Sequence, residues 1–156
     1  MSALIDYIQI EIHKTYNKKY SKKYIEDKLI PIINYISSSK SNKFLFGGSQ
    51  GIGKSSFINI ISKTIEKFYN KKILLLSLDN YYLSKKHRLL LSKQIHKLLI
   101  TRGVPGTHDI KKLVKNIKQF NKGKYPITTP LFDKLIDDTS KSTKISKTKC
   151  DILFLE

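Results

Sequence analysis

The chain has 156 residues, a length that favours one domain with a substantial apolar core. Its formal net charge of +18 raises nucleic acid as a partner, but nearly all 30 basic residues are lysines spread along the whole chain, with only Arg88 and Arg102 as exceptions. Nucleic-acid binders usually concentrate arginine and aromatic residues on one face, so a solvated lysine-rich surface is the favoured interpretation.

The cysteine content and the hydropathy indicate the cellular compartment in which the protein is expected. Cys150 is the only cysteine, so no intrachain disulfide can form, and we expect a reducing, cytoplasmic environment. The first residues include Asp6 and Glu11 and lack a long apolar core, and no stretch approaches the length of a membrane span. We therefore expect neither a secretory signal nor a membrane partner.

Residues 3–38 are predicted to be helical, and Pro31 starts or kinks the second piece. Two apolar stripes support this prediction: Leu4, Ile5, Ile8 and Ile12, then Tyr24, Ile25, Leu29, Ile32, Ile33 and Ile36. A polar loop over residues 37–42 follows. We expect an N-terminal helical segment at 1–42 and a nucleotide-binding core at 43–156.

The core begins with an apolar run at 43–46, of strand character, and then a complete GxxxxGK[ST] phosphate loop from Gly48 to Ser55. Such a loop needs glycines because its backbone N–H groups must turn toward an anion without Cβ atoms in the way. The alternative is a glycine-rich turn before an ordinary helix. The predicted phosphate contacts are Gly48, Ser49, Gln50, Gly51, Ile52, Gly53, Lys54, Ser55 and Ser56.

A βαβ unit is predicted around the loop. The helix between Ser55 and Asn70 carries an apolar stripe of Phe57, Ile60, Ile61, Ile65 and Phe68, and the apolar run at 73–78 is typical of a buried parallel strand. That strand stops at Asp79. Since the carboxyl ends of parallel strands meet at one sheet edge, we expect Asp79 near the bound nucleotide.

The remaining elements are less regular. A helix is predicted at 85–100 with Leu91, Ile95, Leu98 and Leu99 inward, then a turn-rich loop at 102–109. Thr107 or Asp109 can cap the next helix, at 110–120. Residues 121–148 are predicted to be irregular and polar, and 151–156 to form a third buried strand. The fold class is therefore α/β: an incomplete P-loop NTPase-type parallel sheet flanked by helices, expected of a truncated protein.

Several segments together resemble the D-glycerate 3-kinase-like family of P-loop kinases, which is related to uridine kinase, phosphoribulokinase and pantothenate kinase. The resemblance covers about residues 30–156, and the stretch Arg-Gly-Val-Pro-Gly-Thr-His-Asp at 102–109 makes it specific. The other matching segments are the phosphate loop, 78–83, His96, 130–134, 137–138 and 151–156. The chain departs from the family at Leu131 and Thr139, where relatives typically have arginine.

The resemblance and the motif together assign chemistry to particular residues. Lys54 is expected to contact the terminal phosphates, and Ser55 with Glu156 to hold Mg²⁺. Asp79 is the predicted catalytic carboxylate for the acceptor hydroxyl, with a turn or helix-cap aspartate as the alternative. The predicted acceptor pocket contains Tyr82, Arg102, His108 and Asp109, each of which also has a structural alternative.

Three functions are in competition. The first is an ATP-dependent kinase that transfers the γ-phosphoryl group to a hydroxyl of a small metabolite, a glycerate-like acceptor being favoured. The second is a nucleotide-binding remnant without catalysis, because the resemblance implies a further C-terminal half, which a complementary fragment would have to supply. The third, motivated only by charge, is a nucleic-acid-associated P-loop NTPase.

Overall fold

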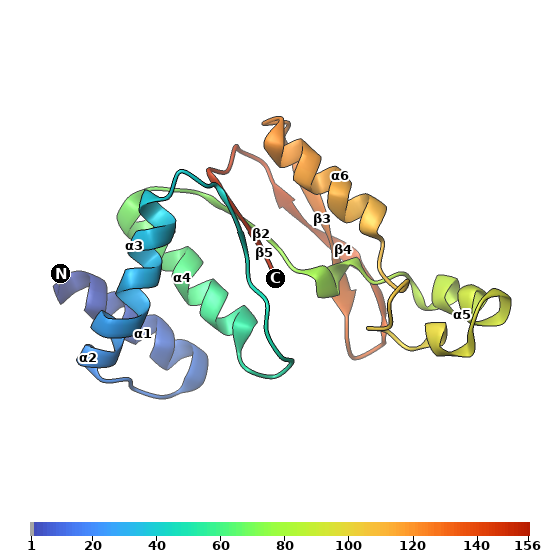
Figure 1. Cartoon of the computed structure of the whole chain (residues 1–156), viewed down its shortest axis with the longest axis horizontal. Helices are drawn as coiled ribbons and strands as arrows, with labels where there is room; N and C mark the ends of the chain where they lie inside the picture. Colours follow the sequence, from blue (N-terminus) through green and yellow to red (C-terminus); the bar gives the residue numbers. More distant parts are fainter. Residues whose placement is uncertain (1) are drawn as a thin grey trace. The chain divides into compact units, whose positions relative to one another are not determined.

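The computed structural model describes residues 2–156, and the chain divides into two compact units (Figure 1). The first unit comprises the chain up to Leu75 together with Cys150–Glu156, and the second comprises Leu76–Lys149. The expected boundary between residues 42 and 43 lies within the first unit.

Helices dominate the first unit, and the predicted helical character of residues 3–38 is confirmed except at residues 17–21. Between α1 and α2 the helix is interrupted at residues 17–21, where the side chain of Ser21 caps the next helix by accepting a hydrogen bond from the backbone of Tyr24. Pro31 lies in the first turn of α3, directly after the π-helical turn η1. The elements are α1 (Ser2–Tyr16), α2 (Lys22–Tyr24), the π-helical turn η1 (Ile25–Leu29), α3 (Ile30–Ser38) and α4 (Lys54–Tyr69).

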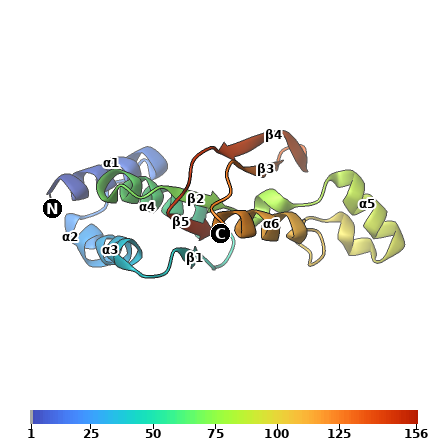
Figure 2. The ribbon, with the colours of Figure 1, turned by 90° about the horizontal axis from the view of Figure 1, so that it is seen from above.

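Three short strands form the sheet beside these helices (Figure 2), and all three were predicted. They are β1 (Lys43–Leu45), β2 (Ile73–Leu76) and β5 (Ile152–Leu155), in the order β1-β5-β2. β1 and β5 are parallel, with Phe44 opposite Phe154. Because β5 is the last strand in the chain but the middle one in the sheet, Glu156 is brought to the sheet edge at which the phosphate loop begins.

The core of the first unit consists of isoleucines from α1, η1, α3 and α4 packed with Ile152 and Phe154. The predicted inward stripe of α4 is confirmed at Ile60, Ile61 and Ile65, but Phe68 is 38% exposed and Ile58 is fully buried instead. The helix contacts both α1 and α3, so its buried face is wider than one stripe.

The second unit contains four helical segments and a two-stranded hairpin. The helical segments are η2 (Leu78–Tyr81), α5 (Lys85–Gln94), η3 (Lys97–Ile100) and α6 (Ile110–Asn121), and the strands are β3 (Ile127–Asp133) and β4 (Asp138–Ser146). The prediction of one helix at 85–100 with Ile95 and Leu98 inward is wrong, because the α-helix ends at Gln94 and these side chains are 70% and 55% exposed. Leu99 is buried as predicted. The fully buried side chain of α5 is that of Arg88.

The prediction that residues 121–148 are irregular is also wrong. β3 and β4 pair as an antiparallel hairpin, and α6 packs against β3. The inward side chains Ile127 and Thr129 alternate with exposed Thr128, which is the period of a half-buried strand. Pro130, which suggested a break, lies beside a shift in the strand register, a place where a sheet tolerates proline.

Candidate functional site

The phosphate loop occupies the turn between β1 and α4 and has the backbone that the motif requires. A Cβ atom on Gly48 would lie 2.7 Å from Cδ1 of Ile52, so a larger residue there would displace the exposed Ile52 side chain. Gly53 has a φ of 85°, a left-handed conformation that glycine adopts without strain, and α4 begins directly after it. Glycine at these two positions therefore keeps the loop open and allows its left-handed turn.

Lys54 lies at the first residue of α4, with its side chain folded over the loop. Its Nζ donates a hydrogen bond of 2.8 Å to the carbonyl oxygen of Ser49. The positive end of the helix dipole is directed at the same turn. Ser49, Gln50, Gly51 and Ile52 are exposed, and Ser56 is half-buried in the first turn. These residues fit the phosphates of a nucleotide because they combine an exposed backbone, the ammonium group of Lys54 and a helix N-terminus.

Ser55 and Glu156 are 101 residues apart in the sequence but adjacent in the structure. The Oγ atom of Ser55 donates a hydrogen bond of 2.6 Å to Oε1 of Glu156. A hydroxyl and a carboxylate are hard oxygen ligands, which Mg²⁺ prefers, and Mg²⁺ completes its shell with water and substrate phosphates. The pair therefore fits a magnesium ion bound together with a nucleotide.

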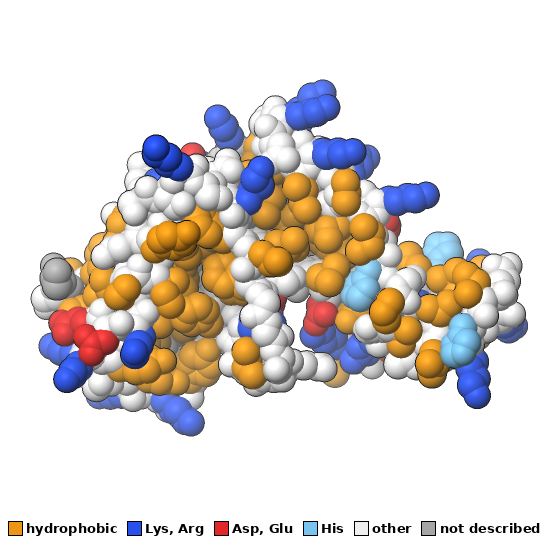
Figure 3. Space-filling view, viewed as in Figure 1, with side chains coloured by type: hydrophobic (Ala, Val, Ile, Leu, Met, Phe, Trp, Pro, Cys, Tyr) orange, Lys and Arg blue, Asp and Glu red, His pale blue; other side chains and the backbone are white. Residues whose placement is uncertain are grey.

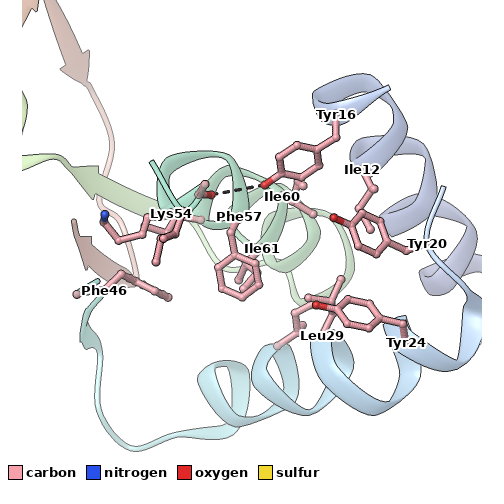
Figure 4. A pocket seen from close by; sticks show the side chains of 15 residues that line it. Ile12, Tyr16, Tyr20, Tyr24, Leu29, Phe46, Lys54, Phe57, Ile60 and Ile61 are labelled. Atoms are coloured by element: carbon pink, nitrogen blue, oxygen red, sulfur yellow. Dashed lines mark hydrogen bonds between the residues drawn. The ribbon is translucent and has the colours of Figure 1, made fainter. Parts of the chain in front are cut away.

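A pocket of about 350 Å³ borders the loop within the first unit (Figure 4). Tyr16 extends across it, and its hydroxyl is 3.5 Å from the carbonyl oxygen of Gly53. The lining residues are Ile12, Tyr16, Tyr20, Tyr24, Leu29, Ile33, Phe46, Gly47, Ile52, Gly53, Lys54, Phe57, Ile58, Ile60 and Ile61. No motif in the sequence indicated this pocket.

Asp79 lies in the second unit, on η2 just after β2, and two side chains hold its carboxylate. Lys134 donates to Oδ2 at 2.7 Å, and the hydroxyl of Tyr82 donates to Oδ1 at 3.1 Å. Burial alone would raise the pKa of Asp79, but the hydrogen bonds from Lys134 and Tyr82 outweigh it, so the pKa lies below its ordinary value. Asp79 is therefore an ionised carboxylate at neutral pH, able to accept a hydrogen bond from a substrate hydroxyl.

Tyr82 and His108 are brought together by the loop at 102–109, which runs antiparallel to the segment after η2. The two rings lie 4.3 Å apart at an angle of 31°. Burial lowers the pKa of His108, and burial together with the Asp79 charge raises the pKa of Tyr82 to about 12. Near pH 7 the imidazole is thus neutral and the phenol keeps its proton.

Asp109, the fourth predicted acceptor residue, caps α6. Its Oδ1 accepts a hydrogen bond of 2.9 Å from the backbone N–H of Lys112, which confirms the predicted cap. Thr107, the other candidate cap, is fully buried, and its hydroxyl donates to the carbonyl of Val104 instead.

Arg102 and Arg88 both bind one carboxylate, that of Asp137. Arg102 donates to Oδ1 at 2.5 Å and Arg88 to Oδ2 at 2.9 Å. Burial by itself raises the pKa of Asp137, but the bonds from Arg102 and Arg88 lower it below the ordinary value. Arg88 also donates to the backbone carbonyls of Leu83, Ile100 and Asp137, which ties α5 to the hairpin.

The sequence predictions missed the roles of Lys134, Arg88 and Asp137. Lys134 and Asp137 stand in segments that carry the family resemblance, and Arg88 is one of two arginines in a lysine-rich chain, so signals existed. The hydrogen-bond partners of these residues could be identified only from the structure, because the hairpin brings them together. In the structure, Lys54, Ser55 and Glu156 belong to the first unit, whereas Asp79, Tyr82, Arg102 and His108 belong to the second.

Two features are absent from residues 2–156. No cluster of three or more histidine, cysteine, aspartate or glutamate side chains is arranged to hold a metal ion by itself. Within the same residues, the helices are too short or too polar to cross a membrane.

The loop, the helix after it and the parallel strand that carries Glu156 define a nucleotide-binding fold of the P-loop class. No protein-family model matches the chain. It is 36% identical over 118 residues to the "Probable ATP-dependent kinase TDA10" of Saccharomyces cerevisiae, a match that covers 69% of this chain and 40% of that protein. This match supports the predicted resemblance to the D-glycerate 3-kinase-like family of P-loop kinases.

Solved structures are similar as well. The YGR205w protein is 31% identical with a TM-score of 0.64, over 86% of this chain and 51% of that one. A D-glycerate 3-kinase from Cryptococcus neoformans has a TM-score of 0.62 over 99% of this chain and 51% of that one, and at 20% identity it shows likeness of fold alone. The chain thus spans about half the length, or less, of these relatives.

Proposed function

We propose that this chain is the nucleotide-binding part of an ATP-dependent kinase that phosphorylates a hydroxyl of a small metabolite, with a glycerate-like acceptor favoured. The observation that carries the proposal is the phosphate loop with Lys54 folded over it and with Ser55 bonded to Glu156 at 2.6 Å. The kinase named among its relatives supports the same reading.

The phosphate-binding roles follow from the contacts. Lys54 exchanges its bond to the Ser49 carbonyl for one to the β- or γ-phosphate, and the loop N–H groups bind the remaining oxygens. Ser55 and Glu156 are the residues that would hold Mg²⁺. Magnesium, when bound, neutralises charge on the phosphate oxygens.

The acceptor roles are assigned to the second unit. Asp79 is proposed to orient the acceptor hydroxyl and to take its proton as the oxygen bonds to the γ-phosphorus and ADP leaves. Neutral His108 and the phenol of Tyr82 can hydrogen-bond sugar-like hydroxyls, and Arg102 fits a carboxylate. A glycerate-like molecule presents both kinds of group.

One observation favours a second candidate, nucleotide binding without transfer. Both arginines of the chain are bound to Asp137, and the hairpin carries Leu131 and Thr139 where relatives typically have arginine. Phosphoryl transfer depends chiefly on positioning and on stabilisation of charge. A site with its cations engaged elsewhere would bind ATP and transfer slowly.

Calorimetry with Mg-ATP tests the proposal. The wild type is expected to bind, and Lys54→Ala to weaken binding by about 10- to 100-fold, since a charge-assisted bond to phosphate is lost. Lys40→Ala, an exposed lysine outside the loop, is the control. Equal binding by the wild type and Lys54→Ala would contradict the proposal.

A transfer assay then separates the two candidates. The first predicts ADP release that depends on D-glycerate and is lost in Asp79→Asn, whereas the second predicts ATP binding with no acceptor-dependent turnover.

A further inference from the structure

Large apolar side chains lie exposed on one segment of the second unit, which consists of α5, η3 and the turn between them. Five such side chains are 42% to 70% exposed, and the proposed function uses none of them. Hydrophobic side chains gather over these two helices, with lysines at the edge (Figure 3). An apolar patch on a protein surface marks a contact with another molecule or with a membrane. The five residues of this α5–η3 face are Leu89, Leu90, Ile95, Leu98 and Ile100.

The backbone under the α5–η3 face is fixed by side chains. The fully buried Arg88 donates a hydrogen bond of 2.8 Å to the carbonyl oxygen of Ile100, at the end of η3. The ring of His96 caps η3 by accepting a hydrogen bond of 3.2 Å from the backbone N–H of Leu98. Leu99 is buried, whereas its two neighbours are exposed. The apolar side chains are therefore presented to solvent by a structured backbone.

The charge of this segment is entirely positive. Residues 85–108 contain no aspartate or glutamate. The nearby carboxylates of the hairpin are already engaged, because Asp137 binds both arginines and Asp138 accepts a hydrogen bond of 2.8 Å from the backbone N–H of Lys85. Any molecule that covers this face must therefore be both apolar and negatively charged. Four lysines of the segment are exposed, and none forms an ion pair with a carboxylate of residues 2–156: Lys85, Lys86, Lys93 and Lys97.

Lysines and leucines are mixed on the exposed side of α5. Lys86 precedes Leu89 and Leu90 by one helical turn, and Lys93 follows them by one turn, so these four side chains share one face. Protein interfaces are depleted in lysine and enriched in tyrosine, tryptophan and arginine, whereas residues 85–100 contain no phenylalanine, tyrosine or tryptophan. At a bilayer surface, by contrast, leucine and isoleucine enter the acyl boundary while lysines extend to the headgroups.

We propose that the α5–η3 face binds the surface of an anionic lipid bilayer. Ile95 and Leu98, the most exposed of its apolar side chains, enter the headgroup boundary, and the lysines contact the negatively charged headgroups. The expectation of no membrane partner was based on the lack of a signal and of a spanning stretch, and surface binding requires neither. A second copy of the chain is a poorer occupant, because two faces of the same positive charge repel each other.

Co-sedimentation with lipid vesicles tests the proposal. The wild type is expected to sediment with vesicles of phosphatidylcholine and phosphatidylserine, to stay in solution with phosphatidylcholine alone, and to be released by salt. Ile95→Ser/Leu98→Ser is expected to lose about tenfold or more in affinity for the mixed vesicles, because apolar area buried in the bilayer is lost. Circular dichroism should show the same fold for this variant. A wild type that stays in solution with the mixed vesicles would overturn the inference.

A pair of charge variants separates this face from the net charge of the chain. Lys86→Gln/Lys93→Gln is expected to weaken binding to the mixed vesicles by about 10- to 30-fold. Lys115→Gln/Lys118→Gln removes the same charge from exposed positions on α6 and should bind nearly as the wild type does. Equal losses in the two variants would mean that the vesicles attract the net charge of +18 and not this face, and the inference would fail.

Tryptophan fluorescence measures the insertion itself, since the chain has no tryptophan. The emission of Ile95→Trp is expected to shift to the blue when mixed vesicles are added, and that of Ile145→Trp, at an exposed position on β4, to stay unchanged. An unchanged emission of Ile95→Trp would contradict insertion. So would a lipid-free dimer, detected by sedimentation equilibrium, that Ile95→Ser/Leu98→Ser dissociates, because the face would then belong to a second copy. Neither result affects Mg-ATP binding, so the proposed function is tested separately.

Discussion

The two units hold their functional groups by different means. In the first, backbone geometry does most of the work: glycines shape the loop, a helix begins under it, and Lys54 and Ser55 project from the first turn over an apolar core. In the second unit, the functional side chains are positioned by hydrogen bonds and ion pairs with other side chains. Asp79 depends on Lys134 and Tyr82, and Arg102 depends on Asp137, which is shared with a fully buried Arg88.

This difference has physical consequences. A site whose shape is set by the backbone is insensitive to pH, because its hydrogen bonds come from peptide groups. It also tolerates most surface substitutions, because apolar core residues hold the elements that carry it. A site built from ion pairs depends on protonation and on each partner, since an unpaired buried charge is costly. We therefore expect substitutions in the second unit to act through charge and those in the first to act through packing.

The largest effect is expected from Arg88→Ala in the second unit. The substitution leaves three backbone carbonyls without their donor and removes one of the two cations at Asp137. Loss of one partner of a buried pair costs about 3–5 kcal/mol in the free energy of unfolding. Urea denaturation measures this loss, and amide hydrogen exchange should show it first in residues 76–149.

Lys86→Ala, an exposed position on the same helix, is the matched control and should change the free energy of unfolding by less than about 0.5 kcal/mol. If Arg88→Ala also lowers the free energy of unfolding by less than about 1 kcal/mol, the stability of the second unit does not depend on the buried Arg88.

Packing in the first unit is tested by Ile65→Ala. Ile65 is fully buried on α4 and lies outside the loop and the pocket, so its truncation creates a cavity without touching either. We expect a loss of about 2–4 kcal/mol in the free energy of unfolding, measured by urea denaturation, with little change in ATP affinity for the folded protein. Ile10→Ala, at a position 51% exposed, should cost far less. A similar loss for both variants would contradict an apolar origin of this stability.

Glu11 is a buried charge in the first unit and therefore an exception to its apolar packing. Glu11 is 3% exposed and accepts hydrogen bonds from Lys14 at 2.9 Å and Lys63 at 2.7 Å. The bonds from Lys63 and then Lys14 lower the pKa of Glu11 below 4.5. Its contribution to stability is therefore complete above pH 4.5 and is lost as the pH falls through the lower, folded-state pKa.

Glu11→Gln should thus destabilise the protein by about 1–3 kcal/mol at pH 7 and by less in acid, so that the two stability curves converge below pH 4.5. Urea denaturation at a series of pH values measures this convergence. Glu26→Gln, an exposed carboxylate of the same unit, is the control. A constant difference between Glu11→Gln and wild type at all pH values would show that the ion pairs are not the cause.

The same contrast explains which features the sequence could predict. The phosphate loop, its helix and the three strands depend on local patterns such as glycine spacing and apolar runs, and these were predicted close to their observed bounds. Glu156 was also predicted beside Ser55, because parallel strands end at one edge and the loop lies there.

Features that depend on pairing between distant residues could not be predicted in this way. The β3–β4 hairpin was missed because Thr, Ser and Lys dominate its strands and Pro130 suggested a break. The tyrosine pocket was missed because Tyr24 was counted with the inward stripe of a helix, whereas it is 44% exposed and lines a concavity. In both regions the neighbouring element that decides which side chains are buried could not be known from the local sequence.

The smallest effect on stability, and the most specific one, is expected from Lys134→Met. The Lys134 to Asp79 pair is 58% and 47% exposed, so its removal should cost less than about 1 kcal/mol in the free energy of unfolding after screening by solvent. Burial raises the pKa of Asp79 and Lys134 opposes this, so without the lysine the pKa must rise from its lowered value toward or above 3.8. Carboxyl NMR titration of Asp79 measures the change, with Lys141→Met on the exposed face of β4 as control. An unshifted pKa in Lys134→Met would mean that Tyr82 alone sets the charge of Asp79, and the second unit would then resemble the first in relying on fewer, more local contacts.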